Sequence, residues 1–121
     1  MFEVEFYEDE RGTSDAREFV VNMADPKLQA KIIGSLQVLA EKGNRLREPY
    51  TKYLEDGIFE LRCKAGNNSA RLLFFYCEGK IVVVTNGFMK QTRKTPRKEI
   101  RLAKRRRAEY MSRKGLRDGN A

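Results

Sequence analysis

The central part of the chain, residues 58–85, reads IFELRCKAGNNSARLLFFYCEGKIVVVT and predicts three strands in succession. Apolar and polar residues alternate over residues 58–64, which is the period of a strand with one buried face. Residues 70–77 are apolar on both faces except for Arg71 and Tyr76, so we expect a central strand there. Turns rich in Gly and Asn separate the segments, as in tight hairpins. The stretch therefore predicts an antiparallel meander whose last strand ends near residue 85.

An N-terminal strand and a first helix are expected before the meander. Residues 2–7 alternate strictly between apolar and polar side chains, which predicts a strand that joins the same sheet. Thr13 or Ser14 can begin a helix, because a hydroxyl there accepts a hydrogen bond from a free backbone N–H of the first turn.

A second helix and a loop follow. Asp25 and Pro26 form a cap residue and a proline at the first helical position, a frequent helix start. Gly43 predicts the end of this helix, because Gly accepts the left-handed backbone conformation found there. The two helices predict an αα-hairpin packed on the sheet, and residues 44–57 predict a loop.

A basic helix is predicted near the C-terminus. Thr95 and Pro96 are expected to cap it, and Gly115 is expected to end it. We therefore expect residues 1–115 to form a single α+β domain and residues 116–121 to form a frayed tail.

The positive charge of the protein is concentrated in its last third. The 121 residues carry a formal net charge of +8. Residues 86–121 hold 13 Lys and Arg against 3 Asp and Glu, whereas residues 1–85 hold 12 against 14. Such asymmetry points to a polyanionic partner, and nucleic acids are the usual polyanions. A solvated basic surface is the alternative; a membrane surface fits less well, because the basic helix lacks a Trp, Phe and Leu face.

The composition excludes several classes of protein. The absence of His excludes imidazole general bases, Ser-His triads and His-ligated metal sites. The longest apolar run, residues 72–77, is far shorter than the ~20 residues of a membrane helix. The acidic start MFEVE does not resemble a signal peptide, and Cys63 and Cys77 are expected to be free, packed thiols. We therefore expect a cytoplasmic protein without a membrane span, a metal centre or a cofactor.

Two arginines on neighbouring strands form the first candidate site. Arg71 lies in the apolar stretch ARLLFFY, where an unpaired buried charge is costly. If the intervening turn sets the register, the guanidiniums of Arg62 and Arg71 emerge together on a face that no helix covers. Such a pair could bind a phosphate through planar, bidentate donors. The alternative is that Arg62 forms a surface ion pair with Glu60 or Glu55.

The segment after the last predicted strand, residues 86–94, is the second candidate. Phe88 could stack on a nucleobase, although an aromatic residue after a strand is often simply core. Lys90 and Lys94 could neutralise phosphates or transfer a proton.

The basic helix provides a third group of candidates. Its run of four cations suits contact with the backbone of a polyanion and carries no base-specific information by itself. The four are Lys104, Arg105, Arg106 and Arg107. Part of the helix charge is expected to support the helix itself, as in the i,i+4 pair of Glu109 and Arg113.

Residues 85–110, TNGFMKQTRKTPRKEIRLAKRRRAEY, closely resemble the signature of HigB-type toxins. These belong to the RelE/ParE-like toxin superfamily and overlap with phage-derived Gp49-like proteins. In that family a strand leads into Gly-Phe-x-Lys-Lys-Thr, then Thr-Pro and a basic helix that starts with Glu-Ile. The stretches DGIFELR and ARLLFFY resemble its paired strands, so the resemblance covers nearly the whole chain. Asn86 stands where relatives often have His, and Gln91 replaces the second Lys of the Lys-Lys pair.

The resemblance implies a RelE-like fold and the toxin of a type II toxin–antitoxin system. Such a toxin cleaves mRNA, usually at the ribosome, without a metal or cofactor, and so inhibits translation. The implied partners are mRNA, the ribosome and a helix-turn-helix antitoxin of the HigA kind, in a toxin–antitoxin heterotetramer. A ParE-like inhibitor of DNA gyrase and a plain RNA-binding module are the alternatives.

The resemblance also assigns roles to the candidate residues. Arg62 and Arg71 match the strand arginines of the family's basic site, and Lys90 is our choice for proton transfer, which makes these three the expected catalytic residues. Phe88 and Lys94 match the aromatic and lysine positions after the last strand. We expect them, with the four cations of the basic helix, to bind RNA.

Overall fold

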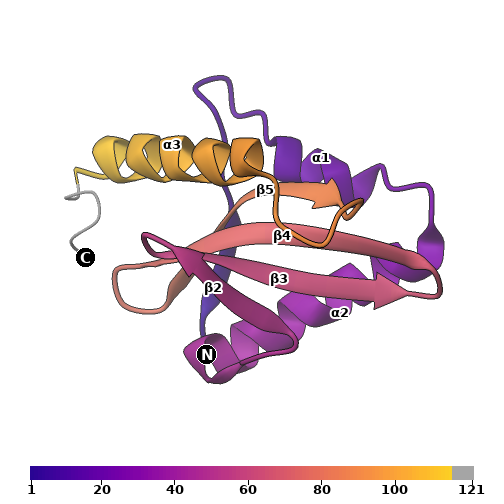
Figure 1. Ribbon diagram of the computed structural model, residues 1–121. Coiled ribbons are helices and arrows are strands. Elements are labelled where there is room, and N and C mark those ends of the chain that lie inside the picture. Colours follow the sequence, from indigo (N-terminus) through magenta and orange to yellow (C-terminus); the bar gives the residue numbers. More distant parts are fainter. Residues whose placement is uncertain (116–121) are drawn as a thin grey trace.

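The computed structural model describes residues 1–115 and shows one mixed sheet with helices on both faces (Figure 1). In chain order the elements are β1 (Glu3–Phe6), α1 (Asp15–Val21), α2 (Pro26–Lys42), the 3-10 helix η1 (Gly43–Arg45), β2 (Thr51–Glu55), β3 (Ile58–Ala65), β4 (Asn68–Cys77), β5 (Ile81–Met89) and α3 (Arg97–Arg113). The predicted α+β architecture is confirmed. The predicted frayed tail, residues 116–121, lies outside the described residues.

The sheet has five strands in the order β1-β5-β4-β3-β2. The predicted meander of β3, β4 and β5 is antiparallel, and β1 joins the sheet by pairing with β5 in parallel. The predicted loop over residues 44–57 is wrong, because it contains β2, which pairs with β3. β2 lies at the sheet edge with much of its TKYLE sequence exposed. An edge strand of this kind lacks the alternation of a strand with a buried face, so the sequence pattern does not reveal it.

β5 continues four residues beyond the predicted end of the last strand. Asn86, Gly87 and Phe88 therefore lie within the sheet and not after it. A Cβ on Gly87 would lie 2.5 Å from Leu72 Cδ2 and 2.7 Å from Phe19 Cδ2. This close packing favours a glycine at this position of the strand.

Two hydrophobic cores occupy the two faces of the sheet. α1 and α2 pack on one face, and α3 packs on the other (Figure 1). The first core includes Leu28, Ile32, Leu39, Leu61, Leu72 and Phe74; the second includes Ile58, Leu73, Phe75, Val83, Ile100 and Ala103. Cys63 and Cys77 are free and buried, one in each core, as predicted.

The ends of the first two helices follow the predicted signals. The Ser14 hydroxyl caps α1, and the Asp25 carboxylate caps α2. Gly43 ends α2 at a φ of 53°, and the ring of Phe2 fills the place of a side chain there. A Cβ on Gly43 would lie 2.0 Å from Phe2 Cε1, so only glycine fits. None of these helices, nor α3, is long and apolar enough to cross a membrane.

Candidate functional site

The two predicted arginines are direct neighbours in the sheet. Arg62 on β3 and Arg71 on β4 are cross-strand partners, and the carboxylate of Glu60 joins them. Glu60 Oε1 accepts a hydrogen bond from Arg71 Nη1 at 3.0 Å and from Arg62 Nε at 3.1 Å. The ion pair between Arg62 and Glu60, which was the alternative to a functional role, is therefore present. Since one carboxylate serves two guanidiniums, the cluster keeps a net positive charge.

Glu60 is the centre of this cluster and was not among the predicted site residues. It is fully buried, and its second oxygen accepts a hydrogen bond from the Thr95 hydroxyl. Thr95 therefore does not cap α3 as predicted; Pro96 occupies the cap position, without a side-chain hydrogen bond. The available signal was the alternation of β3, which puts an acid on the same face as Arg62.

The arginines lie on the face of the sheet that carries α3. The prediction that no helix covers this face is wrong, because Ile100 of α3 belongs to the core built on Leu73 and Phe75. Arg71 shares the face of Leu73 and Phe75 by the alternation of β4. A ligand would therefore approach Arg71 beside the first turn of α3, and not across an open face of the sheet.

A hollow of about 400 Å³ opens beside Arg71, between the end of β5 and the first turn of α3. Its lining consists of Arg71, Phe88, Met89, Lys90, Gln91, Thr92, Lys94, Pro96, Lys98 and Glu99. Four of the predicted residues thus meet in one place, although they come from a central strand, a strand end and a loop. Arg62 does not line the hollow; it lies beside Arg71 on β3, and both guanidiniums donate to Glu60 Oε1. With four cations and one carboxylate around it, the hollow is suited to a phosphate group.

Phe88 belongs both to the core and to the hollow. It is the cross-strand partner of Arg71, and it packs as a half-buried residue against the core beneath α3. Its exposed part lines the hollow. The two interpretations of Phe88 made from the sequence are therefore compatible.

An asparagine and a glutamate join β5 to the first turn of α3. Asn86 Nδ2 donates to Glu99 Oε1 at 2.9 Å and to the Glu99 main-chain oxygen at 3.3 Å. The Thr85 hydroxyl donates to Asn86 Oδ1 at 2.6 Å. Neither Asn86 nor Glu99 was predicted as a site residue; the only sequence signal was the Asn at a position where relatives often have His.

Two of the basic residues in the middle of α3 hold the turn between β2 and β3. Lys104 forms ion pairs with Glu55 and with Asp56, the latter at 2.7 Å, and Arg107 donates to the main-chain oxygen of Asp56. Hydrogen bonds from Arg97 and Lys104 lower the pKa of Glu55 from its ordinary 4.5 to about 2. These contacts fasten α3 to the edge of the sheet.

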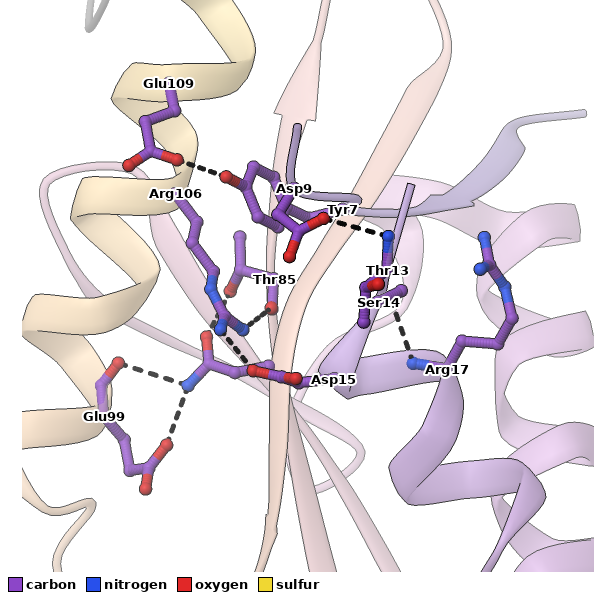
Figure 2. Close-up of polar contacts among 11 residues, drawn as sticks. Tyr7, Asp9, Thr13, Ser14, Asp15, Arg17, Thr85, Glu99, Arg106 and Glu109 are labelled. Carbon is purple, nitrogen blue, oxygen red and sulfur yellow. Dashed lines mark hydrogen bonds and ion pairs between the residues drawn. The ribbon is translucent and has the colours of Figure 1, made fainter. Parts of the chain in front are cut away.

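Arg106 connects the same helix to β5 and to α1. Its guanidinium donates to the Thr85 main-chain oxygen at 2.9 Å and forms an ion pair with Asp15 at the start of α1 (Figure 2). Arg105 is exposed and has no partner among residues 1–115. The assignment of the four helix cations to RNA binding stays a prediction, and Arg105 is the one whose side chain is free to fulfil it without breaking a contact.

No metal site is formed within the described part of the chain. Residues 1–115 contain no group of three or more His, Cys, Asp or Glu that could hold a metal ion.

The α+β fold, with its five-stranded mixed sheet and C-terminal helix, is consistent with the class of RelE-like proteins. Residues 20–108 match the phage-derived Gp49-like protein family, and the chain belongs to that family, which is one of RelE- and HigB-like toxins. No curated protein sequence matches the chain. Membership places the protein in the toxin superfamily of toxin–antitoxin systems and implies, in general, an antitoxin partner.

Proposed function

We propose that this toxin is an endoribonuclease that cleaves mRNA on the ribosome, with the hollow beside Arg71 as its reaction centre. The observation that supports the proposal is the meeting of Arg71, Phe88, Lys90 and Lys94 around one hollow of about 400 Å³. Guanidinium and ammonium groups bind phosphate, and an aromatic ring provides a surface on which a base can stack. A site with these two properties suits a nucleotide linkage.

The proposed reaction uses the 2′-hydroxyl of the substrate as the nucleophile. Its oxygen attacks the adjacent phosphorus while the bond from phosphorus to the 5′-oxygen breaks, which leaves a 2′,3′-cyclic phosphate and a 5′-hydroxyl. Arg71 stabilises the negative charge that develops on the phosphoryl oxygens, and Arg62 adds positive charge from beside it. Lys90 gives a proton to the leaving 5′-oxygen. No metal ion takes part.

Glu60 is a positioning residue in this account. Both of its oxygens are engaged inside the protein, so it does not reach the substrate. By accepting from Arg62 and Arg71, it fixes both guanidiniums before the substrate arrives. Donors held in place in this way contribute more to catalysis than mobile ones.

The proposed partner is a helix-turn-helix antitoxin of the HigA kind, in a toxin–antitoxin heterotetramer. The basic C-terminal third supports an acidic or polar partner surface, because opposite charges accelerate association. Since the substrate is translated mRNA, we place the protein in the cytoplasm.

The proposal is tested by inducing the toxin in growing cells and mapping mRNA 5′ ends by primer extension. We expect wild-type protein to arrest growth and cleave translated mRNA, and Arg71→Ala and Lys90→Ala to lose both effects. Lys90→Ala should keep the stability of the wild type, because Lys90 is exposed, so its loss of cleavage reports on the site and not on the ion pair of Arg71. Lys27→Ala is the control, since Lys27 is exposed on α2 on the opposite face of the sheet. Intact mRNA with DNA damage would instead indicate gyrase inhibition. Salt-dependent RNA binding without growth arrest would indicate a binding module.

A further inference from the structure

The proposed cleavage needs a group that takes the proton of the 2′-hydroxyl, and the protein has no His for that task. We propose that Glu99 is this general base, while Lys90 acts as the general acid. The inference rests on the proposed function. Lys90 protonates the leaving 5′-oxygen, and Glu99 accepts the proton of the attacking 2′-hydroxyl.

Glu99 is the only carboxylate among the described residues that line the hollow. It is half-buried and comes from the first turn of α3, on the side of the hollow next to Lys98. The other nearby carboxylate, Glu60, is fully buried and engaged by Arg62, Arg71 and Thr95. Glu60 could accept a substrate proton only by giving up these partners, whereas Glu99 is placed to do so directly.

Hydrogen bonds from β5 hold the Glu99 side chain in place. The Asn86 amide donates to the Glu99 main-chain oxygen, which can only accept, so its NH₂ group faces Glu99 and also donates to Oε1 at 2.9 Å. On the other side of the amide, Asn86 Oδ1 lies 2.6 Å from the Thr85 hydroxyl, which is also within hydrogen-bond distance of the Leu73 main-chain oxygen. Arg106 anchors the Thr85 main chain beneath these hydrogen bonds (Figure 2). Within residues 1–115, Glu99 forms no ion pair, and its Oε2 accepts no hydrogen bond from a side chain or backbone. One carboxylate oxygen is thus held and the other is available for a proton.

The step balances in atoms and charge. Glu99 Oε2 takes the proton of the 2′-hydroxyl as the bond from the 2′-oxygen to phosphorus forms. The bond from phosphorus to the 5′-oxygen breaks, and the Lys90 ammonium gives its proton to that oxygen. Proton exchange with water then restores both side chains. Arg71 from β4, Lys94 from the loop and Lys98 from α3 are the other charged groups around the hollow, and they compensate the charge on the phosphoryl oxygens.

Glu99→Gln is the decisive variant, because it keeps the size of the side chain and the acceptor for Asn86 but cannot take up the proton. We expect its single-turnover cleavage of ribosome-bound mRNA to fall by about 10²–10⁴-fold. Its affinity for RNA should be unchanged or higher, because a negative charge is lost. Glu109→Gln is the matched control: Glu109 lies on the same helix and accepts a hydrogen bond from Tyr7, but it is not in the hollow lining. The control should cleave at the wild-type rate.

A substrate with a sulfur in place of the 5′-bridging oxygen separates the base from the acid. A thiolate leaves without protonation, so Lys90→Ala should regain rate on this substrate and Glu99→Gln should stay slow. Cleavage by Glu99→Gln at the wild-type rate would overturn the assignment of Glu99 while leaving the nuclease proposal in place. The same holds if the Glu99→Gln variant regains its cleavage rate on the sulfur substrate. Failure of the wild-type protein itself to cleave would overturn both.

Discussion

Arg71 and Glu60 form a buried ion pair across β4 and β3, with Arg71 Nη1 3.0 Å from Glu60 Oε1 and side-chain exposures of 10% and 0%. Burial of such a pair costs desolvation free energy, and removal of one partner costs more, because it leaves the other charge buried and unpaired. The guanidinium is therefore held in one orientation while Arg71 still lines the hollow. The pair thus links the stability of the sheet to the geometry of the site.

Removal of Glu60 should destabilise the fold. Glu60→Ala leaves the buried Arg71 without its carboxylate, and we expect the free energy of unfolding in urea to fall by about 3–5 kcal/mol. The double variant Glu60→Ala/Arg71→Ala should lose less than the sum of the two single losses, because each single variant already breaks the pair. Additive losses would contradict this coupling.

Replacement of Phe88 by leucine should distinguish its packing in the core beneath α3 from its stacking on an RNA base. Phe88→Leu keeps most of the apolar volume beneath α3, so stability should change by less than about 1.5 kcal/mol. RNA affinity, measured by fluorescence anisotropy, should fall by the equivalent of about 1–3 kcal/mol, because leucine offers no ring for a base to stack on. An unchanged affinity would show that Phe88 serves only the core.

The ion pairs of Glu55 predict a pH-dependent contribution to stability. Its pKa is lowered from 4.5 to about 2 in the folded state, mainly by the hydrogen bond from Arg97. A depressed folded pKa gives stability that is present above the unfolded value and is lost as the pH falls toward the folded value. Glu55→Gln should therefore be less stable than wild type at pH 7, and the difference should shrink between pH 4.5 and 2. Urea unfolding across this range checks the sign; a difference independent of pH would contradict it.

Two neighbouring arginines of α3 should behave differently. Arg106→Ala loses the contacts with Thr85 and Asp15, and we expect it to lower the free energy of unfolding by about 1–3 kcal/mol. Arg105→Ala should leave stability unchanged but weaken RNA binding and reduce its salt dependence by about one counterion. If the two variants changed stability and RNA binding equally, Arg106 would not be structural and Arg105 would not be specific to RNA binding.

The sequence predicts the parts of this fold that have a strong periodicity or a specific end signal. Strict alternation reveals β1 and β3, and Asp25 with Pro26 marks the start of α2. β2 escapes prediction because an exposed edge strand needs no apolar face. The end of β5 is hidden because Gly87, a turn signal in isolation, is favoured here by close packing.

The site is only partly predictable for a related reason. The residue types of Arg71, Phe88, Lys90 and Lys94 already point to phosphate and base binding, and the structure brings them to one hollow. The sequence offers Glu60 only as a surface ion-pair partner of Arg62 and gives no signal for Glu99, because carboxylates are common and the roles of these two depend on tertiary partners. The hydroxyl of Thr95 illustrates the point, since its usual role at a helix start gives way to a hydrogen bond with Glu60.

The chemistry of the cleaved ends tests the central claim most directly. Purified protein is added to ribosomes that translate a labelled mRNA, and the fragment ends are identified. We predict 2′,3′-cyclic phosphate and 5′-hydroxyl ends, no cleavage where the attacking nucleotide carries a 2′-deoxyribose, and no cleavage by Arg71→Ala. Intact mRNA, or fragments with 5′-phosphate and 3′-hydroxyl ends, would contradict a reaction driven by the 2′-hydroxyl in this hollow.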